Sequence, residues 1–243
     1  PYFVRILELM ADTTHINTNV EAMAKAGMHF GAMRSRRHPS TKSSVYGTKG
    51  KVEMVDLEKT QMALDKAAAF VHSVSAAGKQ VLFVGSKNEA REAVRRAAES
   101  IHQPWVALRW IGGTLTNFDE IRKRIDRLAD LEAQERSGEL AKYTKKERLL
   151  LGREMKDLER LFGGITGLTE MPGAMFVVDS GKEEIAVTEA HQAHIPVIAF
   201  SSTDCDVSNI EYPIIGNDKA QASIELVLRA IVDAYKAGKK PVV

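Results

Sequence analysis

Few side chains in this sequence have the types and spacings that catalysis requires, and they do not form a complete set. His191 and His194 are three residues apart on an expected helix, so their imidazoles could bind one metal ion, but no cysteine or carboxylate at a firm spacing completes such a site. Asp204 and Asp206 could form a carboxylate pair, although in a turn rich in Ser, Thr and Asp they are better explained as caps of local backbone groups. Cys205 is the single cysteine, and no motif that activates a thiol surrounds it. We therefore expect no enzyme, no metal site and no cofactor.

Two segments resemble phosphate-binding loops only in part. Val84, Gly85 and Ser86 lead from an expected strand into an expected helix, so their backbone amides could hold an anion. Residues 75–79 lack the first glycine of a P-loop, and Gln80 stands where Ser or Thr would bind magnesium. The dinucleotide-binding fingerprint is absent from the sequence. A nucleotide- or flavin-binding module stays open as an alternative function.

Positive charge is concentrated in one segment. The whole chain has a formal net charge of +2, yet no acidic residue occurs between Glu21 and Glu53. A localised basic segment predicts a polyanionic partner, and the alternative is a solvated loop that happens to lack acids. The residues of this segment that we expect to contact such a partner are Lys25, His29, Arg34, Arg36, Arg37, Lys42, Lys49 and Lys51.

A second charged segment, residues 119–162, has the pattern of two helices folded back on each other. Each helix has one thin apolar stripe, and in the second helix the apolar residues recur at spacings of four, three and four, as in a coiled coil. Such helices can bury little except against each other, which predicts an antiparallel coiled-coil hairpin that projects from the body; we call it the arm. A solvated coiled coil without a ligand is the alternative. The further candidates for phosphate contacts are Arg109, just before the arm, and Arg122, Lys123, Lys145 and Lys146 within it.

The rest of the chain alternates expected strands with expected helices. Continuous apolar runs such as 81–85, 174–179 and 196–200 are typical of strands buried on both faces, and we also expect strands at 52–57, 105–108 and 212–215. This alternation predicts an α/β fold with a doubly wound parallel sheet. Residues 10–118 and 163–243 would form the α/β domain, the arm 119–162 would be inserted in it, and 27–51 would be irregular.

Composition limits the broad class of the protein. Of 243 residues, 44% are hydrophobic and 27% charged, which allows a sizeable core, and no apolar run approaches the ~20 residues that span a bilayer. A single cysteine favours a reducing, cytosol-like compartment. Residues 1–9 are apolar and precede Met10, which looks like a natural start, so we expect them to be an extra or non-native segment.

Several motifs together identify a family resemblance. Residues 109–118, RWIGGTLTNF, closely resemble the signature of the bacterial-type small-subunit ribosomal protein S-two family. Further matches follow in order over residues 20–238, and this ordered set is more specific than any single motif. They are 26–31 (AGMHFG), 55–60 (VDLEKT), 162–165 (FGGI), 171–179 (MPGAMFVVD), 195–199 (IPVIA) and 212–218 (YPIIGND).

The resemblance implies a flavodoxin-like sandwich with a protruding coiled-coil hairpin. It also implies a structural constituent of the small ribosomal subunit that binds 16S-type rRNA, contacts neighbouring ribosomal proteins and helps to dock the S-one protein, which captures messenger RNA. The location would be the ribosome of a bacterial cytoplasm, with an organelle as the alternative. Residues 32–34 and 37–39 replace the His and Trp-Asn-Pro that are usual in the family, so the basic charge is kept but the aromatic ring is lost. A scaffold that binds only protein is the third hypothesis.

Overall fold

The computed structural model describes residues 20–239. The segment 1–9, expected to be extra or non-native, lies outside the described residues, as does the start of the expected α/β domain at residue 10. Within 20–239, no helix combines the length and the hydropathy needed to cross a bilayer.

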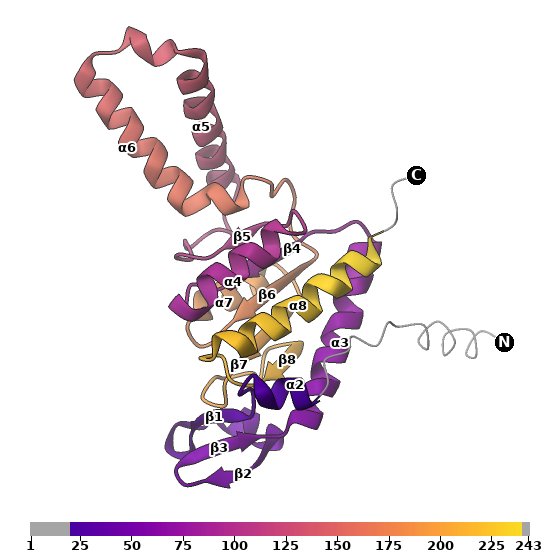
Figure 1. Ribbon diagram of the computed structural model, residues 1–243. Coiled ribbons are helices and arrows are strands. Elements are labelled where there is room, and N and C mark those ends of the chain that lie inside the picture. Colours follow the sequence, from indigo (N-terminus) through magenta and orange to yellow (C-terminus); the bar gives the residue numbers. More distant parts are fainter. Residues whose placement is uncertain (1–19, 240–243) are drawn as a thin grey trace, which may run out of the picture.

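A five-stranded parallel sheet forms the centre of the molecule (Figure 1). Its order is β5-β4-β6-β7-β8, which in chain order reads 2-1-3-4-5, the order of flavodoxin-like sheets. The predicted α/β class and parallel sheet are confirmed. The strands are β4 (Val81–Val84), β5 (Trp105–Val106), β6 (Ala174–Val178), β7 (Val197–Ser201) and β8 (Tyr212–Ile215).

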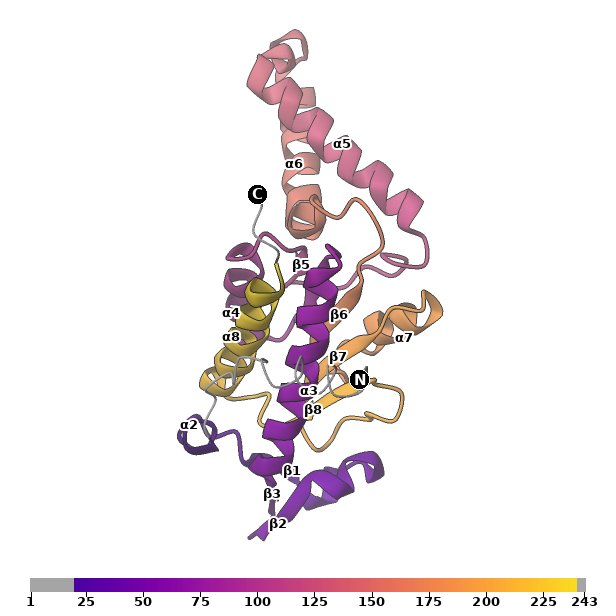
Figure 2. The same cartoon turned by 90° about the vertical axis from the view of Figure 1, so that its right-hand side faces the viewer.

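Helices cover both faces of this sheet (Figure 2). On one face α3 (Leu57–Ala76), α4 (Asn88–Glu99) and α8 (Gln221–Gly238) pack against alternate strand residues such as Phe83 and Phe176. On the other face α7 (Glu184–Gln192) packs against the residues between them, such as Val177. Because side chains alternate across a strand, burial on both faces requires an apolar residue at every position, and this explains the continuous apolar runs.

Residues 27–51 are not irregular, and this prediction was wrong. After α2 (Val20–Lys25), the chain forms β1 (Phe30–Met33), two short 3-10 helices (Arg34–Arg36 and Pro39–Ser44), β2 (Val45–Lys49) and β3 (Val52–Val55). These strands make a separate antiparallel sheet in the order β1-β3-β2, so 52–55 does not belong to the parallel sheet, as the alternating pattern had suggested. Gly50, at φ 66°, permits the short turn between β2 and β3.

Thr203 makes several of the contacts that fasten this small sheet to the main domain. Thr203, in the turn after β7, accepts a hydrogen bond from the Ala32 amide at 2.9 Å through Oγ1. Its carbonyl oxygen accepts bonds from the His38 amide and from the Thr41 hydroxyl, both at 2.9 Å. The contacts join segments more than 160 residues apart in sequence, so the position of the small sheet is fixed by the main domain.

The arm consists of α5 (Phe118–Ser137), a 3-10 turn (Glu139–Lys142) and α6 (Lys145–Phe162), and it projects from the end of the domain opposite the small sheet (Figure 1). Gly138, at φ 75°, ends α5, and a capping box between Thr144 and Glu147 begins α6. The apolar stripe of α5 is buried at Ile121, Ile125, Leu128 and Leu131, as are Leu158 and Phe162 of α6. The two folded-back helices are therefore observed, while their supercoiling and the domain boundaries stay predictions.

Candidate nucleic-acid interface

The basic segment becomes an exposed surface around the small sheet. We call it the cationic end, and it consists of Arg34, Arg36, Lys42, Lys49 and Lys51. All five side chains are exposed, and none forms an ion pair with an acid among residues 20–239. Glu53 is the acid that ends the acid-free stretch, and its side chain is fully buried. Five uncompensated cations therefore lie close together at one end of the molecule.

Arg37 is set apart from the other arginines of this segment. Its guanidinium donates a 2.9 Å hydrogen bond to the carboxylate of Glu53 and is itself partly buried. A buried carboxylate without a partner is costly, so Arg37 supports the fold of the small sheet. Its predicted contact with RNA stays a prediction, but loss of this residue would affect stability as well.

His29 and Lys25 lie beside the small sheet in different surroundings. His29 is half-buried, and its ring packs on that of Phe30 with ring centroids 4.1 Å apart. The backbone carbonyl oxygen of His29 accepts a 2.8 Å hydrogen bond from the Val55 amide. Lys25 is exposed in the last turn of α2. Lys25 is therefore the more accessible of these two candidates.

The arm candidates lie at the far end of the molecule from the cationic end (Figure 1), so the structure does not bring the two predicted groups together. Lys123 pairs with Glu120, and the pKa of Lys123 is raised by its hydrogen bond to that carboxylate and by its charge. Arg122 donates to the Leu168 carbonyl oxygen at 3.2 Å and lies 3.5 Å from Asp126. Lys145 and Lys146 are exposed, without an acidic partner in the described part of the chain.

The loop 109–118 is organised by a buried carboxylate, Glu189 of α7. The carboxylate accepts hydrogen bonds from Trp110 Nε1 at 3.1 Å, from the Gly113 amide at 2.8 Å and from the Leu115 amide at 3.0 Å. Trp110 is 7% exposed and belongs to the core, while Arg109 is exposed. This loop therefore holds the start of the arm against the main domain.

The turn before α4, whose amides could hold an anion, is occupied by a side chain of the protein itself. The Ser86 amide donates a 2.8 Å hydrogen bond to Glu183 Oε1, and the Glu183 side chain is buried. The anion held at this turn is therefore an internal carboxylate. Glu183 and Glu189 were both missed, because a single glutamate in a helical segment is usually exposed.

Charged groups fill the carboxyl edge of the parallel sheet, where doubly wound folds usually bind ligands. Lys87 Nζ lies 3.1 Å from Asp179 and 3.1 Å from Asp218. Burial and repulsion by Asp179 raise the pKa of Asp218 to about 6. Burial alone would raise the pKa of Asp179, but the charge and hydrogen bond of Lys87 outweigh it and lower that pKa. Two carboxylates at this edge disfavour a nucleotide phosphate.

Cys205 completes a group with potential metal ligands. One ligand atom each of Asp179, Asp218 and Cys205 lies within 4.8 Å of the others. The cation between the carboxylates is the Lys87 ammonium, and burial raises the pKa of the Cys205 thiol to about 12. A protonated thiol beside an internal cation fits the expected structural role of this cysteine.

The remaining candidates for chemistry do not come together. The helix α7 ends at Gln192, so His194, at φ 55°, does not share a helix face with His191, contrary to expectation. Asp206 accepts a 2.9 Å hydrogen bond from the Ser208 amide, which confirms its expected capping role.

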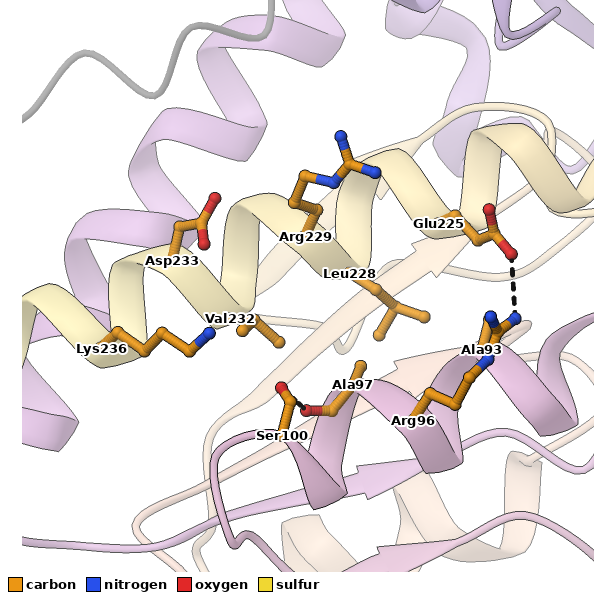
Figure 3. A pocket seen from close by; sticks show the side chains of 10 residues that line it. All are labelled: Ala93, Arg96, Ala97, Ser100, Glu225, Leu228, Arg229, Val232, Asp233 and Lys236. Carbon is orange, nitrogen blue, oxygen red and sulfur yellow. Dashed lines mark hydrogen bonds and ion pairs between the residues drawn. The ribbon is translucent and has the colours of Figure 1, made fainter.

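A shallow depression of about 290 Å³ lies between α4 and α8 (Figure 3). Ala93, Ala97, Leu228 and Val232 line it, and its charged residues of both signs lie along α4 and α8. Arg96 pairs with Glu225 at 3.2 Å across it, so these two charges already neutralise each other. The depression also lies on the helical face, away from the carboxyl edge of the sheet.

These features define a class of protein: a scaffold that presents an uncompensated basic surface and a projecting arm, in place of a reactive pocket. The family model described as Ribosomal protein S2 matches residues 23–238, and the chain belongs to this family. The family supplies structural components of the ribosome, so the expectation that the protein is not an enzyme is confirmed by membership.

Three relatives, each described as "Small ribosomal subunit protein uS2", illustrate the similarity. The protein of Nocardia farcinica is 42% identical over 219 residues, covering 90% of this chain and 77% of the relative. That of Salinibacter ruber is 40% identical over 226 residues, covering 93% and 70%. That of Helicobacter acinonychis is 39% identical over 218 residues, covering 90% and 89%.

Proposed function

We propose that this protein is a structural constituent of the small ribosomal subunit and binds 16S-type rRNA through backbone phosphates. The single observation that carries the proposal is the cationic end, where five exposed cations have no acidic partner among the described residues. Lysine and arginine contacts to phosphates fix the position of a protein on RNA without reading base identity. Membership of a ribosomal protein family supports RNA as the polyanion.

The contacts divide into primary and secondary groups. The cationic end and Lys25 are primary, because these side chains are exposed and uncompensated. Arg109, Lys145 and Lys146 are secondary, and Arg122 and Lys123 contribute less because both have partners within the protein. His29 and Arg37 lie at the margin of the primary group. The arm acts as a coiled-coil strut that reaches a second site in the assembled particle.

The partners and the location follow from the family resemblance. The protein would contact neighbouring small-subunit proteins, support docking of the S-one protein and act while bound to ribosomes in a bacterial cytoplasm. The three relatives described above come from bacteria, which supports this location over an organelle. Sedimentation of a cell extract tests the proposal: comigration with small subunits is expected, and release of the S-one protein on depletion would support docking.

The electrostatic mechanism is tested by salt titration of binding to small-subunit rRNA. If about five phosphates are neutralised, the logarithm of the affinity should fall against the logarithm of salt concentration with a slope near −4. Replacing Arg34, Arg36 and Lys51 together with glutamine should bring the slope closer to zero by about 2 to 3. A wild-type slope near zero would refute the mechanism.

The control for this triple variant is a set of cations that already have partners. Arg95, Arg96 and Lys59 lie in α3 and α4 and pair with acids of the protein. Their replacement with glutamine removes the same formal charge as the triple variant. Because these cations already pair with acids of the protein, the salt slope should stay nearly unchanged. An equal effect of both triple variants would mean that net charge, rather than a defined surface, drives binding.

A further inference from the structure

The outer face of the small sheet carries apolar side chains that are only partly buried. Phe30 is paired with Met54, and Met33 with Val52, across β1 and β3. Directly opposed residues of an antiparallel pair point to the same face, and the bulge between Phe30 and Met33 keeps both on it. Phe30 is 45% and Met33 42% exposed, while Glu53 and Val55, on the opposite face, are buried.

The surroundings of this face are cationic. Lys49 is paired with Val52 and therefore shares the face. At the same end, Arg34 and Lys51 border a hollow of about 500 Å³ beside Met33, and their backbones are joined by a 3.0 Å hydrogen bond. The segment has no exposed acid, because Glu53 is buried and bound to Arg37. The occupant of this face must therefore be negatively charged and must also offer flat apolar surfaces.

A second exposed aromatic ring lies on the edge strand of the same sheet. Tyr46 lies in the bulge between Val45 and Gly47 on the edge strand β2, and it is 85% exposed. An exposed aromatic ring among lysines and arginines is the arrangement with which proteins bind single-stranded nucleic acid, since bases stack on the rings while cations contact the phosphates.

We propose that the two exposed rings of the small sheet, Phe30 on its outer face and Tyr46 on its edge strand, stack unpaired nucleotides of the rRNA. This inference rests on the proposed function and deepens it. Phosphate contacts alone would fit single-stranded and double-stranded RNA equally well, whereas stacking on the rings requires unpaired bases. The face is continuous with the cationic end, so one RNA segment contacts both. An acidic peptide of a neighbouring protein would satisfy charge but would not require flat rings.

The test measures binding of the full chain to a single-stranded oligonucleotide and to a duplex of the same sequence. Tyr46→Ala and Phe30→Leu should each weaken binding to the single strand by roughly five- to hundredfold, the size expected for loss of one base–aromatic stack. Neither variant should change the salt slope, because no phosphate contact is removed. Phe30→Leu keeps an apolar side chain in the sheet, and thermal unfolding of both variants checks that the fold is retained.

The control is Ile185→Ala, which removes an exposed apolar side chain on α7, 64% exposed, and should bind like the wild type. Equal losses for single strand and duplex, or wild-type affinity in both aromatic variants, would overturn stacking. Wild-type RNA affinity combined with loss of comigration with small subunits would instead assign the face to a protein neighbour. A wild-type chain that shows no salt-dependent RNA binding would overturn the proposed function itself, so the two failures are distinguishable.

Discussion

The two ends of this molecule contain the same kinds of charged residue and use them in opposite ways. In the arm, many cations pair with acids of the same arm, as in Arg127 with Glu154 and Lys123 with Glu120. At the cationic end, residues such as Arg34 and Lys51 have no acidic partner within residues 20–239. The charges of the arm therefore largely neutralise one another, whereas the small sheet presents a net positive charge to solvent.

The comparison shows that counting basic residues overestimates the binding potential of a helical hairpin. Acids three or four residues away on the same helix neutralise its cations at little cost, because these positions are neighbours on the surface. A small sheet with 3-10 turns between its strands has no such internal partners unless the sequence places them across a strand. The position of the acids, rather than the number of cations, separates the two ends.

The largest expected effect concerns the attachment of the arm. Glu189→Ala leaves the Trp110 indole and the amides of Gly113 and Leu115 without their acceptor, and we expect the free energy of unfolding to fall by about 3 kcal/mol or more. Urea denaturation measures it. Glu184→Ala, an exposed residue of the same helix, should change it by less than about 0.5 kcal/mol. Equal effects would mean that Glu189 does not hold the loop.

A somewhat smaller effect is expected at the opposite end. Arg37→Met removes the partner of the buried Glu53 and should lower the free energy of unfolding by about 2 kcal/mol. The exposed Arg34→Met should be nearly neutral in the same denaturation experiment. If Arg37→Met is equally neutral, Arg37 belongs with the free cations and the distinction drawn within this segment fails.

The two ends are compared directly through RNA affinity, with roughly 1 kcal/mol expected per lost contact at moderate salt. Replacing Arg122, Lys123 and Arg127 of the arm, which pair with acids of the arm, with glutamine should bring the salt slope closer to zero by about 1 or less. The corresponding change for Arg34, Arg36 and Lys51 is about 2 to 3. Electrophoretic mobility shifts over a salt series provide both values. A larger change from the arm variant would reverse the ranking of the two ends.

The smallest effect tests the neutralisation of the arm. Arg127 makes two hydrogen bonds to Glu154, at 3.0 and 3.2 Å, between exposed positions on α5 and α6. A double-mutant cycle with Arg127→Gln and Glu154→Gln should give a coupling of about 0.5 kcal/mol, reduced by added salt. A coupling of zero would show that the pair does not form in solution and that these cations are available to a partner.

The parallel sheet could be predicted from sequence because its physical requirement is local. A strand such as 212–215 or 174–178 needs apolar residues at successive positions, and the pattern is visible without knowledge of its neighbours. The small sheet could not be predicted in the same way. Its central strand was expected at 52–57, but β1 and β2 lie in the segment expected to be irregular. The position of the sheet depends on contacts such as those of Thr203, more than 160 residues away.

The candidate interface was predictable in outline but not in detail. The absence of acids between Glu21 and Glu53 located the cationic end from the sequence alone. The same reasoning grouped Arg37 with its neighbours, because the pairing of Arg37 with Glu53 is a contact across the fold. The buried carboxylates Glu183 and Glu189 could not be predicted for the same reason. They accept hydrogen bonds from backbone amides across the fold, and every residue type but proline has such an amide.

The carboxylate of Glu189 also bears on how a particle could be assembled. The Glu189 carboxylate binds the loop 109–118, which leads into the arm. The first turn of the arm therefore has a fixed orientation before the protein binds a partner. Little of the free energy of association is then lost in ordering the first turn of the arm. A rigid, preorganised element generally binds with a smaller entropic cost.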